Sequence, residues 1–597
     1  MRLKQLYTNL DEKFEPVTFN RGLNFVLAEI RLPENQDKDI HNLGKSTLGD
    51  VIDFCLLKGK SKSFFLFKHP ELFEDFVFYL EIQLEDDTLF TIRRSVADAT
   101  KISFKKHNDS ANLHKDPTTF WDHEDVAFDR AKNILDSTLN LSSLKPWAYR
   151  NGLGYLIRGQ DDYTDIFKLA AFQGAHSLWK PFLAQTLGFE AQPIVSFYEK
   201  EKKLAEEKQK LETIQLELAG LDNNSGKVEG MLQLRRRAYE EQAALLEQFN
   251  FNQADLGSTE ELVDEIDVEI AGLNKKRYSL KHNRRKISAA LKKEAISFDP
   301  EKAKELFKES NVFFDGQLKK DFEQLIKFNK AITTERRKYL REELSEVETE
   351  LTSTELRLEE LSEKRANTLA FLSSTDVFQK YKEISEQQVQ IRADIESLER
   401  QKEFLSTVQK HKNNIRELSE ERDKYRDEIE EDVATKNSDS ESRFSQIRFY
   451  FNEIVNHVID RNALLSVGLN QEDHLEFAGE ILDEQGRSTS ASAGNSYRKL
   501  LCVAFDLAVL RSHLESDFFR FAFHDGVFDS LDPRKKTKLL SVLREYASKG
   551  LQLIVTTLDS ELPPSQSEET PAIKETEVVV RLHDEGAEGR LFKVASF

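Results

Sequence analysis

The hydrophobic pattern divides the chain into three parts with different periods. The first 196 residues carry short apolar runs of strand length, at 1–7, 23–30, 76–84 and 89–94. An acidic turn at 85–87 separates the last two runs and predicts a hairpin. Another apolar run at 154–158 ends just before Gln160, and a helix is expected over 163–171. We therefore predict a mixed α/β lobe over residues 1–196.

Between residues 197 and 442 the pattern changes to that of a coiled coil. Apolar residues recur in steps of three, four and seven, as at Leu204, Leu211, Ile214, Leu218 and Leu221. Glycine and proline become rare there, while Glu, Lys, Leu and Gln dominate. Polar breaks interrupt the apolar seam at 223–226, 252–258 and 373–378, and a longer break spans 294–330.

This seam predicts an antiparallel coiled-coil hairpin inserted into the globular part. The ascending arm covers 197–295, the apex 296–330 with its turn near 296–317, and the descending arm 331–442. An unbroken arm of about 100 residues is about 150 Å long. The alternatives are two separate helices packed on a globular body, or a parallel dimer. The apex contains no cysteine for a zinc site, so a contact there depends on apolar residues such as Phe313, Phe314 and Leu318.

The pattern of a globular lobe resumes at 443–597. An amphipathic helix at 444–459 precedes two strands, and a long apolar helix follows at 497–510. A strand at 518–523, a helix at 533–547 and a strand at 552–556 come next, and a closing hairpin is expected at 577–582 and 590–594. The fold class is thus α/β, with a head assembled from the N- and C-terminal lobes around a long helical insertion.

The amino-acid composition limits the partners and the cell compartment that can be expected. Charged residues make up 32% of the chain and the formal net charge is −20, so the overall field does not attract DNA. There is no apolar run of about 18 residues, so no membrane span is expected. The two cysteines, Cys55 and Cys502, lie in apolar helical patterns, which fits a reducing cytoplasm.

The strand at 23–30 leads, through a polar insert, into the sequence His-Asn-Leu-Gly-Lys-Ser-Thr at 41–47. A glycine followed by Lys-Ser at the start of a helix is typical of a phosphate-binding loop, because unsatisfied helix amides and a lysine attract anions. The position five residues before Gly44, where a first glycine is usual, is Asp39. The residues expected to bind ATP and Mg²⁺ here are Asn42, Gly44, Lys45, Ser46 and Thr47, with the Ser46 hydroxyl on the metal.

Two C-terminal motifs fit the same chemistry. The apolar strand before His524 ends in Asp525, a position suited to support Mg²⁺, and Asp532 follows within Ser-Leu-Asp. Asp532 is also a good N-cap for a helix that begins at Pro533. Upstream, a serine-rich loop with Ser492 and Gly494 precedes the long apolar helix and offers a second anion site.

Taken in order, these motifs resemble the SMC-type ABC ATPases, a group that includes RecN-like repair proteins. Phosphate loop, glutamine, coiled-coil hairpin, serine–glycine loop, acid-ending strand and Ser-Leu-Asp span the whole chain, although each motif is degenerate. The phosphate loop, the short hairpin and the run at 496–507 are also similar to the ATPase subunit of three-component, Lamassu-type antiphage defence systems. The resemblance implies an ATP-driven dimer of heads.

The resemblance implies a role for each matched residue. Gln160 matches the glutamine that senses Mg²⁺ and the γ-phosphate, and Asp525 the acid that supports Mg²⁺. Ser492 and Gly494 match the signature loop, which binds the γ-phosphate held by the opposite head, and Asp532 matches the loop that crosses the dimer interface.

The resemblance also has a conspicuous gap. The family usually places a catalytic glutamate directly after the magnesium acid, and that position is Gly526. Either another group such as His524 or Asp529 takes over, or the head binds ATP and hydrolyses it slowly. The enzyme assignment is therefore open, with a slow ATPase favoured.

Partners follow from the same resemblance. A homodimer through the heads, DNA, and separate effector and accessory subunits are expected, without a membrane. Basic stretches at 235–237, 275–293 and 336–338 either contact DNA phosphates or pair with glutamates of neighbouring helix faces. The alternatives to a defence ATPase are a repair or chromosome-maintenance factor, or a structural adaptor that binds nucleotide without hydrolysing it.

Overall fold

Two units make up the part of the chain that the structure describes. The computed structural model describes residues 1–32, 43–109, 114–116, 119–169, 176–217, 224–247, 256–292, 316–370, 376–489, 494–529, 531–564 and 572–595. The first unit contains Met1–Lys202 and Ser419–Phe597, and the second contains Lys203–Leu418. The predicted α/β class with a helical insertion is confirmed at this level.

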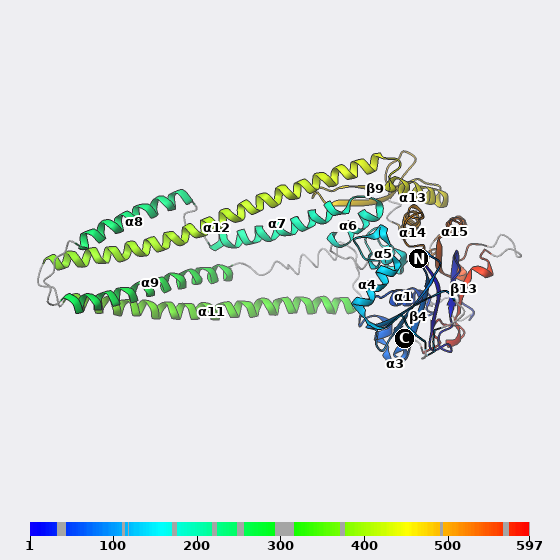
Figure 1. The fold of residues 1–597 in the computed structure, drawn as a ribbon, viewed down its shortest axis with the longest axis horizontal. Helices are drawn as coiled ribbons and strands as arrows, with labels where there is room; N and C mark the ends of the chain where they lie inside the picture. Colours follow the sequence, from blue (N-terminus) through cyan, green and yellow to red (C-terminus); the bar gives the residue numbers. More distant parts are fainter. Residues whose placement is uncertain are drawn as a thin grey trace. The chain divides into compact units, whose positions relative to one another are not determined.

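A parallel sheet of five strands forms the centre of the first unit (Figure 1). In spatial order its strands are β13 (Val578–His583), β3 (Leu23–Glu29), β12 (Gln552–Leu558), β11 (Phe521–Asp525) and β8 (Ile157–Arg158). All four pairings are parallel. Strands from both ends of the chain are therefore combined in one sheet, and their carboxyl ends share one edge.

The three middle strands are buried along nearly their whole length, as expected for parallel strands covered on both faces. Their almost continuous apolar runs are the reason that the sequence predicts all three.

A second, antiparallel sheet has the order β2 (Val17–Thr18), β1 (Arg2–Thr8), β4 (Val77–Gln83), β5 (Leu89–Ser95), β6 (Lys101–His107) and β7 (His123–Ala127). β4 and β5 pair in register as the predicted hairpin. A separate two-stranded ribbon joins β9 (Ala463–Leu469) to β10 (Leu475–Ile481). Strands β6 and β7 lie in a region whose mixed polarity gives no clear prediction.

The helices of the first unit cover these sheets. They are α1 (Lys45–Cys55), α2 (Phe65–Lys68), α3 (Pro70–Phe73), α4 (Phe128–Leu139), α5 (Arg150–Leu156), α6 (His176–Leu187), α13 (Arg443–Ile459), α14 (Asn495–Ser512) and α15 (Pro533–Ser548). Short 3₁₀ turns are η2 (Ser142–Leu144), η3 (Gln160–Tyr163), η6 (Asp559–Glu561), η7 (Glu575–Glu577) and η8 (Ala587–Gly589). The long apolar helix predicted at 497–510 is confirmed as α14.

Two local predictions are wrong for identifiable reasons. The helix expected at 163–171 is absent from the described residues up to 169, because the Arg158 guanidinium takes the carbonyls of Asp162 and Ile166, each at 2.8 Å. Those carbonyls would otherwise accept helical hydrogen bonds. The closing hairpin is absent too, since β13 pairs in parallel with β3 while the Leu591 amide bonds to the Leu43 carbonyl at 3.0 Å.

The second unit is entirely helical within the described residues. It contains α8 (Ser225–Glu247), α9 (Leu256–Lys292) and α11 (Gly316–Ala370), with parts of α7 (Ala191–Glu217) and α12 (Asp376–Ser438). Two small apolar clusters hold it together: Val228, Leu232, Leu398, Leu405 and Val408, and Ile266, Ile270, Leu358 and Leu361.

Contacts between these helices fix their directions. α8 runs antiparallel to α12, and α9 antiparallel to α11, because residue numbers fall along one helix of each pair as they rise along the other (Figure 1). The ion pairs are Arg235–Asp394 and Glu229–Lys402 for the first pair, and Lys276–Glu350 and Asp267–Arg365 for the second. α9 runs parallel to α12, because Tyr278 contacts Arg400 and His282 contacts Phe404.

The chain therefore changes direction three times between α8 and α12, not once. Helix direction differs between α8 and α9, between α9 and α11, and between α11 and α12. The residues that connect these helices, and with them Phe313 and Phe314, lie outside the described residues. The predicted ascending arm at 197–295 contains one reversal, so a single hairpin with its turn near 296–317 is wrong. The first and last reversals coincide with polar breaks in the apolar seam, which mark helix ends that a continuous arm would not need.

No helix among the described residues is long and apolar enough to cross a membrane.

Cross-linking distinguishes the two helical arrangements. The Arg400 guanidinium carbon lies 5.3 Å from the centre of the Tyr278 ring. A Tyr278→Cys, Arg400→Cys variant is therefore expected to link within one chain through a short bismaleimide, measured by denaturing gel electrophoresis and peptide mass spectrometry. A Tyr278→Cys, Lys410→Cys control moves one thiol about 15 Å along α12 and should not link. Linking of the control alone would contradict the parallel packing of α9 and α12.

Candidate functional site

The loop before α1 has the backbone that a phosphate site needs. Gly44 is the N-cap of α1 and has φ +97°, a left-handed conformation that disfavours other residues. A Cβ there would lie 2.7 Å from the Cβ of Leu591, so the C-terminal segment packs tightly on the loop. Lys45, Ser46 and Thr47 form the first turn of α1, which contains no acidic residue. The helix amides and dipole are thus available to an anion.

Ser46 and Asp525, which are 479 residues apart in sequence, meet directly. The Ser46 hydroxyl donates to Asp525 Oδ2 at 2.5 Å, and the Thr556 hydroxyl donates to Asp525 Oδ1. Asp525 is completely buried at the end of β11. The predicted phosphate loop and the predicted magnesium acid are therefore brought together by the fold.

The donors at this point fit Mg²⁺ better than a transition metal. A hydroxyl and a carboxylate are hard oxygen ligands, and Mg²⁺ is commonly held by one or two such groups plus phosphate oxygens and waters. Among the described residues, no group of three or more His, Cys, Asp or Glu side chains can hold a metal ion. Ser46 and Asp525 supply two oxygen ligands that fit Mg²⁺ bound together with phosphate oxygens.

Lys45 carries its charge in a partly buried, acidic setting. Burial lowers the pKa of Lys45 from its usual value, while Asp525, Asp529 and Glu561, in that order, oppose the shift. An ammonium group desolvated in this way interacts strongly with an incoming anion.

The turn after β11 holds a lysine that the sequence did not reveal as a site residue. Lys499, in the first part of α14, donates from Nζ to the Gly526 carbonyl at 2.8 Å and to Asp529 Oδ2 at 3.1 Å. Its ammonium also lies 5.1 Å from the centre of the Tyr163 ring. The sequence signal for this residue is a lysine directly before a long apolar run of a helix, because a charge at such a place needs a partner.

Gly526, the residue directly after Asp525, has a specific steric role. Its φ is +65°, and a Cβ would lie only 2.3 Å from Asp529 Oδ2. The Asp529 carboxylate therefore fills the space from which a side chain at position 526 would start.

His524 belongs to a buried polar cluster. Its Nε2 lies 3.0 Å from Asp506 Oδ2, and Asp506 also receives two hydrogen bonds from Arg158, at 2.6 and 2.9 Å. Burial disfavours the charge of Arg158, but the adjacent Asp506 carboxylate prevails and raises the Arg158 pKa above its usual value. His524 and Arg158 are fully buried, and the contact of His524 to Asp506 gives it a structural role, while its catalytic role stays a prediction.

The other predicted residues lie on the same edge of the sheet or outside the described residues. Gln160 follows β8, where Arg158 pairs with His524, so Gln160 comes level with the turn after Asp525. Gly494 is the N-cap of α14, whereas Asn42 and Ser492 are outside the described residues. Within the part of the chain that the structure describes, no hydrogen bond or ion pair joins Gln160 or Gly494 to the loop before α1.

Asp532 is the N-cap of α15, as its sequence context predicts. Its carboxylate accepts the Lys535 amide at 3.1 Å and pairs with the Lys535 ammonium at 2.6 Å. Lys535 Nζ in turn donates to the Tyr497 hydroxyl at 3.1 Å, which links the start of α15 to α14. The N-cap role leaves open a second role at an interface between heads.

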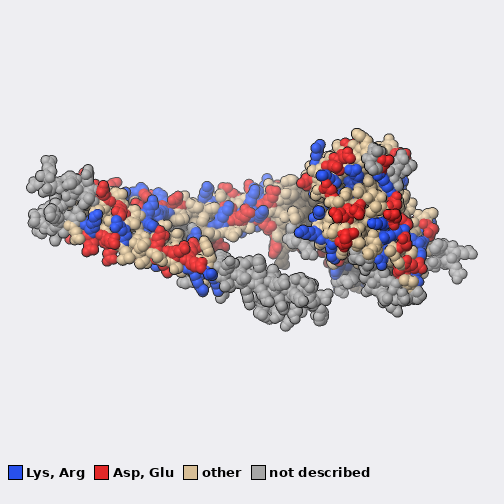
Figure 2. Space-filling view, turned by 90° about the horizontal axis from the view of Figure 1, so that it is seen from below, with Lys and Arg blue, Asp and Glu red and all other residues tan. Residues whose placement is uncertain are grey.

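Several basic residues of the helical unit are paired with glutamates. Lys276 and Lys281 contact Glu350 and Glu355 on α11 at 2.7 and 2.9 Å, and Arg236 contacts Glu399 at 2.6 Å. Figure 2 shows both signs of charge interspersed along the helices on the face that it displays. This favours charged helix faces paired with glutamates over a track for DNA phosphates.

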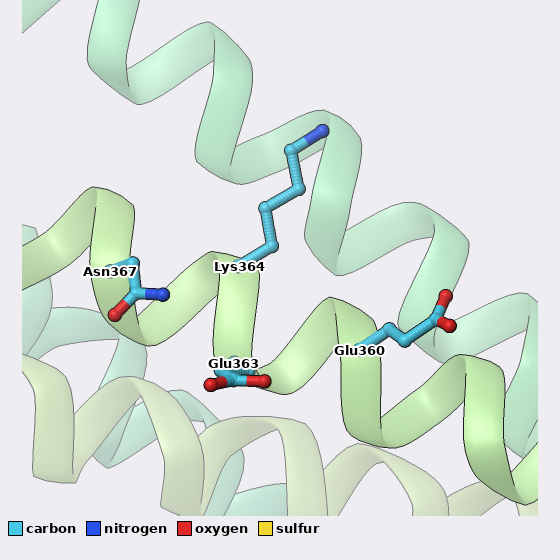
Figure 3. A pocket seen from close by; sticks show the side chains of 4 residues that line it. All are labelled: Glu360, Glu363, Lys364 and Asn367. Atoms are coloured by element: carbon cyan, nitrogen blue, oxygen red, sulfur yellow. The ribbon is translucent and has the colours of Figure 1, made fainter.

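A hollow beside α11 does not form a convergent site. Its lining residues are Glu360, Glu363, Lys364 and Asn367, all exposed and all from successive turns of one helix. Figure 3 shows these side chains pointing in different directions along α11. A binding site needs polar groups that converge on a ligand, so this surface carries no functional assignment.

Comparisons with known proteins give a partial match. Residues 454–596 match the family described as "Uncharacterised protein conserved in bacteria (DUF2326)". No curated protein matches the chain. One similar solved structure is an Smc head domain with a coiled coil and joint from Pyrococcus yayanosii, with 15% identity, 93% of this chain and 92% of that chain covered, and a TM-score of 0.35.

Two further solved structures are Smc heads bound to parts of ScpA. One, from Pyrococcus furiosus, has an extended coiled coil and the C-terminal domain of ScpA, with 13% identity, 94% and 90% coverage and a TM-score of 0.31. The other is bound to the C-winged helix domain of ScpA, with 11% identity, 94% and 91% coverage and a TM-score of 0.32. TM-scores this low support no conclusion about function, for which the site geometry has to stand by itself.

The buried cluster behind the site yields a stability prediction. Asp506→Asn removes the charge that compensates Arg158, so the free energy of unfolding should fall by about 3 kcal/mol or more. Denaturant unfolding followed by tryptophan fluorescence measures it, because all three tryptophans lie in the first unit. The exposed Glu515→Gln is the matched control and should change stability little. Equal stability of the two variants would show that the Arg158–Asp506 pair contributes nothing.

Proposed function

We propose that this chain is the ATP-binding subunit of an SMC-type ABC ATPase, whose heads dimerise around ATP and Mg²⁺. The observation that carries the proposal is the contact between Ser46 and Asp525, in which a phosphate-type loop meets a strand-end acid. Gly44 and Lys45 add the left-handed cap and the desolvated cation that such a site requires. Chance adjacency of four matched groups from opposite ends of a chain is a poor explanation.

The residues of this chain have distinct tasks in that site. The amides of the first turn of α1 hold the phosphate groups, and Lys45 neutralises charge on the β- and γ-phosphates. Ser46 and Asp525 would hold Mg²⁺, which polarises the phosphoryl group when bound. Thr556 fixes the rotamer of Asp525 through its hydroxyl, and its carbonyl and hydroxyl both accept from the Gly526 amide, at 3.2 and 3.1 Å. Gln160, which follows β8 at the same edge of the sheet, would sense Mg²⁺ and the γ-phosphate.

Coupling to partners is the finer part of the proposal. Closure of two heads would bring the Gly494 loop and Asp532 of one copy to the nucleotide of the other, and the helical unit would transmit closure to DNA and to accessory or effector subunits. Its motifs resemble antiphage defence ATPases, which makes defence our preferred setting over repair or chromosome maintenance. An adjacent gene for a nuclease-like effector would favour defence, and its absence would favour the other two.

A second candidate function rests on Gly526. Without a carboxylate at that position, the chain would be an adaptor that binds nucleotide and does not hydrolyse it. Phosphate release separates the two: we expect slow but measurable turnover that Lys45→Ala abolishes. A rate typical of transport ATPases would contradict slow turnover.

Nucleotide-dependent assembly tests the main proposal. With ATP and Mg²⁺, the natural protein should approach twice its monomer mass in light scattering, because each nucleotide bridges two heads. Lys45→Ala should stay monomeric and bind a fluorescent ATP analogue at least about 10-fold more weakly, since it loses a charged contact. Lys62→Ala, an exposed lysine near the end of α1, is the control and should behave as the natural protein. Unchanged nucleotide affinity of Lys45→Ala would sink the proposal.

A further inference from the structure

Two carboxylates at the end of β11 differ in how many of their oxygens are engaged. Asp525 is fully buried and both its oxygens accept hydroxyl groups, from Ser46 and Thr556. The side chain of Asp529 is 36% exposed, and the contacts that the structure gives it hold only one oxygen, Oδ2, on Lys499. Asp525 is thus arranged to hold a cation, whereas Asp529 keeps an oxygen directed elsewhere than to Lys499.

Both carboxylates act on the lysine of the phosphate loop. Asp525 has the largest and Asp529 the second largest charge effect on Lys45, ahead of Glu561. Glu561, like Asp529, is engaged by a lysine through one oxygen, whereas His524 is tied to Asp506 in the buried cluster. Asp529 differs from Glu561 in its place, because its Oδ2 lies 2.3 Å from where a Cβ on Gly526 would stand, directly after Asp525 in the sequence.

We propose that Asp529 accepts the proton of the water that attacks the γ-phosphate, and that Lys499 is the residue that positions it. The inference deepens the proposed function and depends on it. Gly526 is the steric condition, because any side chain there would collide with the Asp529 carboxylate at 2.3 Å. The carboxylate that this position lacks is supplied from three residues further along the same turn.

The reaction balances with the groups named. The water oxygen forms a bond to the γ-phosphorus, and the bond from that phosphorus to the bridging oxygen breaks, leaving its electron pair on ADP. One water proton passes to Asp529 and then to solvent, so no oxidant or further reactant is required. Lys499 keeps the carboxylate in place through contacts to both the Gly526 carbonyl and Asp529.

Tyr163 adds an independent sign of a polar site at this point. Tyr163 is only 5% exposed, yet its hydroxyl has no hydrogen-bond partner among the described residues. Burial, followed by the charge of Asp525, raises the pKa of Tyr163 well above its usual value, so the hydroxyl stays protonated. A buried donor without a partner costs free energy unless a bound group completes it. Tyr163 and Lys499, whose ammonium faces the Tyr163 ring, therefore border the same small polar region.

Substitution of Asp529 tests the inference on the full chain. Asp529→Asn should lower the turnover number in steady-state phosphate release by roughly 100-fold, while affinity for a fluorescent ATP analogue stays within about threefold. Asp559→Asn, an exposed carboxylate just after β12, is the matched control and should keep natural turnover. Turnover of Asp529→Asn within threefold of the natural protein overturns the inference, provided that its thermal midpoint shows it folded.

Lys499 needs a test that a purely structural role would not satisfy. Lys499→Met should lower the turnover number with the Michaelis constant for ATP nearly unchanged, and Lys499→Arg should restore much of it by keeping the charge. Natural turnover in Lys499→Met would overturn the positioning role. Equal loss of turnover in both variants, at natural stability, would overturn it as well.

A relocated carboxylate gives a second route if Asp529→Asn folds poorly. In Gly526→Glu, Asp529→Gly the collision is removed and the carboxylate returns to position 526, so turnover should exceed that of Asp529→Gly alone. No gain overturns the inference. If the natural protein releases no phosphate above the Lys45→Ala background yet binds ATP and dimerises, the inference fails while the proposed function stands.

Discussion

The hydrogen bond between Ser46 and Asp525 is the contact on which the candidate site of the first unit depends. It joins residues 479 positions apart, so its formation requires β3, β12 and β11 to lie side by side first. The free-energy cost of loop closure grows only slowly with loop length, by about 0.6 kcal/mol per doubling. The long helical insertion therefore destabilises the first unit only a little. The buried apolar strands provide the driving force, and the polar contact then forms at their common edge.

A buried charge cluster supports that edge from behind. Arg158 lies on β8, His524 on β11 and Asp506 on α14, and the three meet without exposure to solvent beyond a few per cent. Because Arg158 also takes the carbonyls of Asp162 and Ile166, one guanidinium fixes both the strand and the turn after it. Such a cluster specifies one register of β8 against β11.

The sequence predicts the structure best where a clear hydrophobic period coincides with a motif at the end of a strand or helix. The three middle strands of the central sheet, the apolar helix α14 and the N-cap Asp532 follow from local patterns that the fold obeys, whereas the meeting of Ser46 with Asp525 was expected only from the resemblance. The helical unit was misjudged because a heptad seam records which face is buried but not which helix covers it. Short polar breaks near 252–258 and 373–378 lie at the ends of helices that run in opposite directions, which the seam alone does not indicate. Lys499 and the role of Gly526 depend on tertiary contacts between segments, which no local period encodes.

The absence of a carboxylate at position 526 is compatible with the ATP hydrolysis that we propose. A glycine at the end of β11 appears at first to remove a catalytic side chain, but its left-handed backbone and lack of a Cβ admit the Asp529 carboxylate instead. Asp529 comes with its own cation, Lys499, which also bonds to the Gly526 carbonyl. A carboxylate held through a longer turn is positioned by more rotatable bonds than one on the strand itself, and looser positioning lowers catalytic efficiency. With Asp529 in the role that we propose, slow turnover would follow from where the carboxylate is anchored, and it would not require that the chemistry be absent.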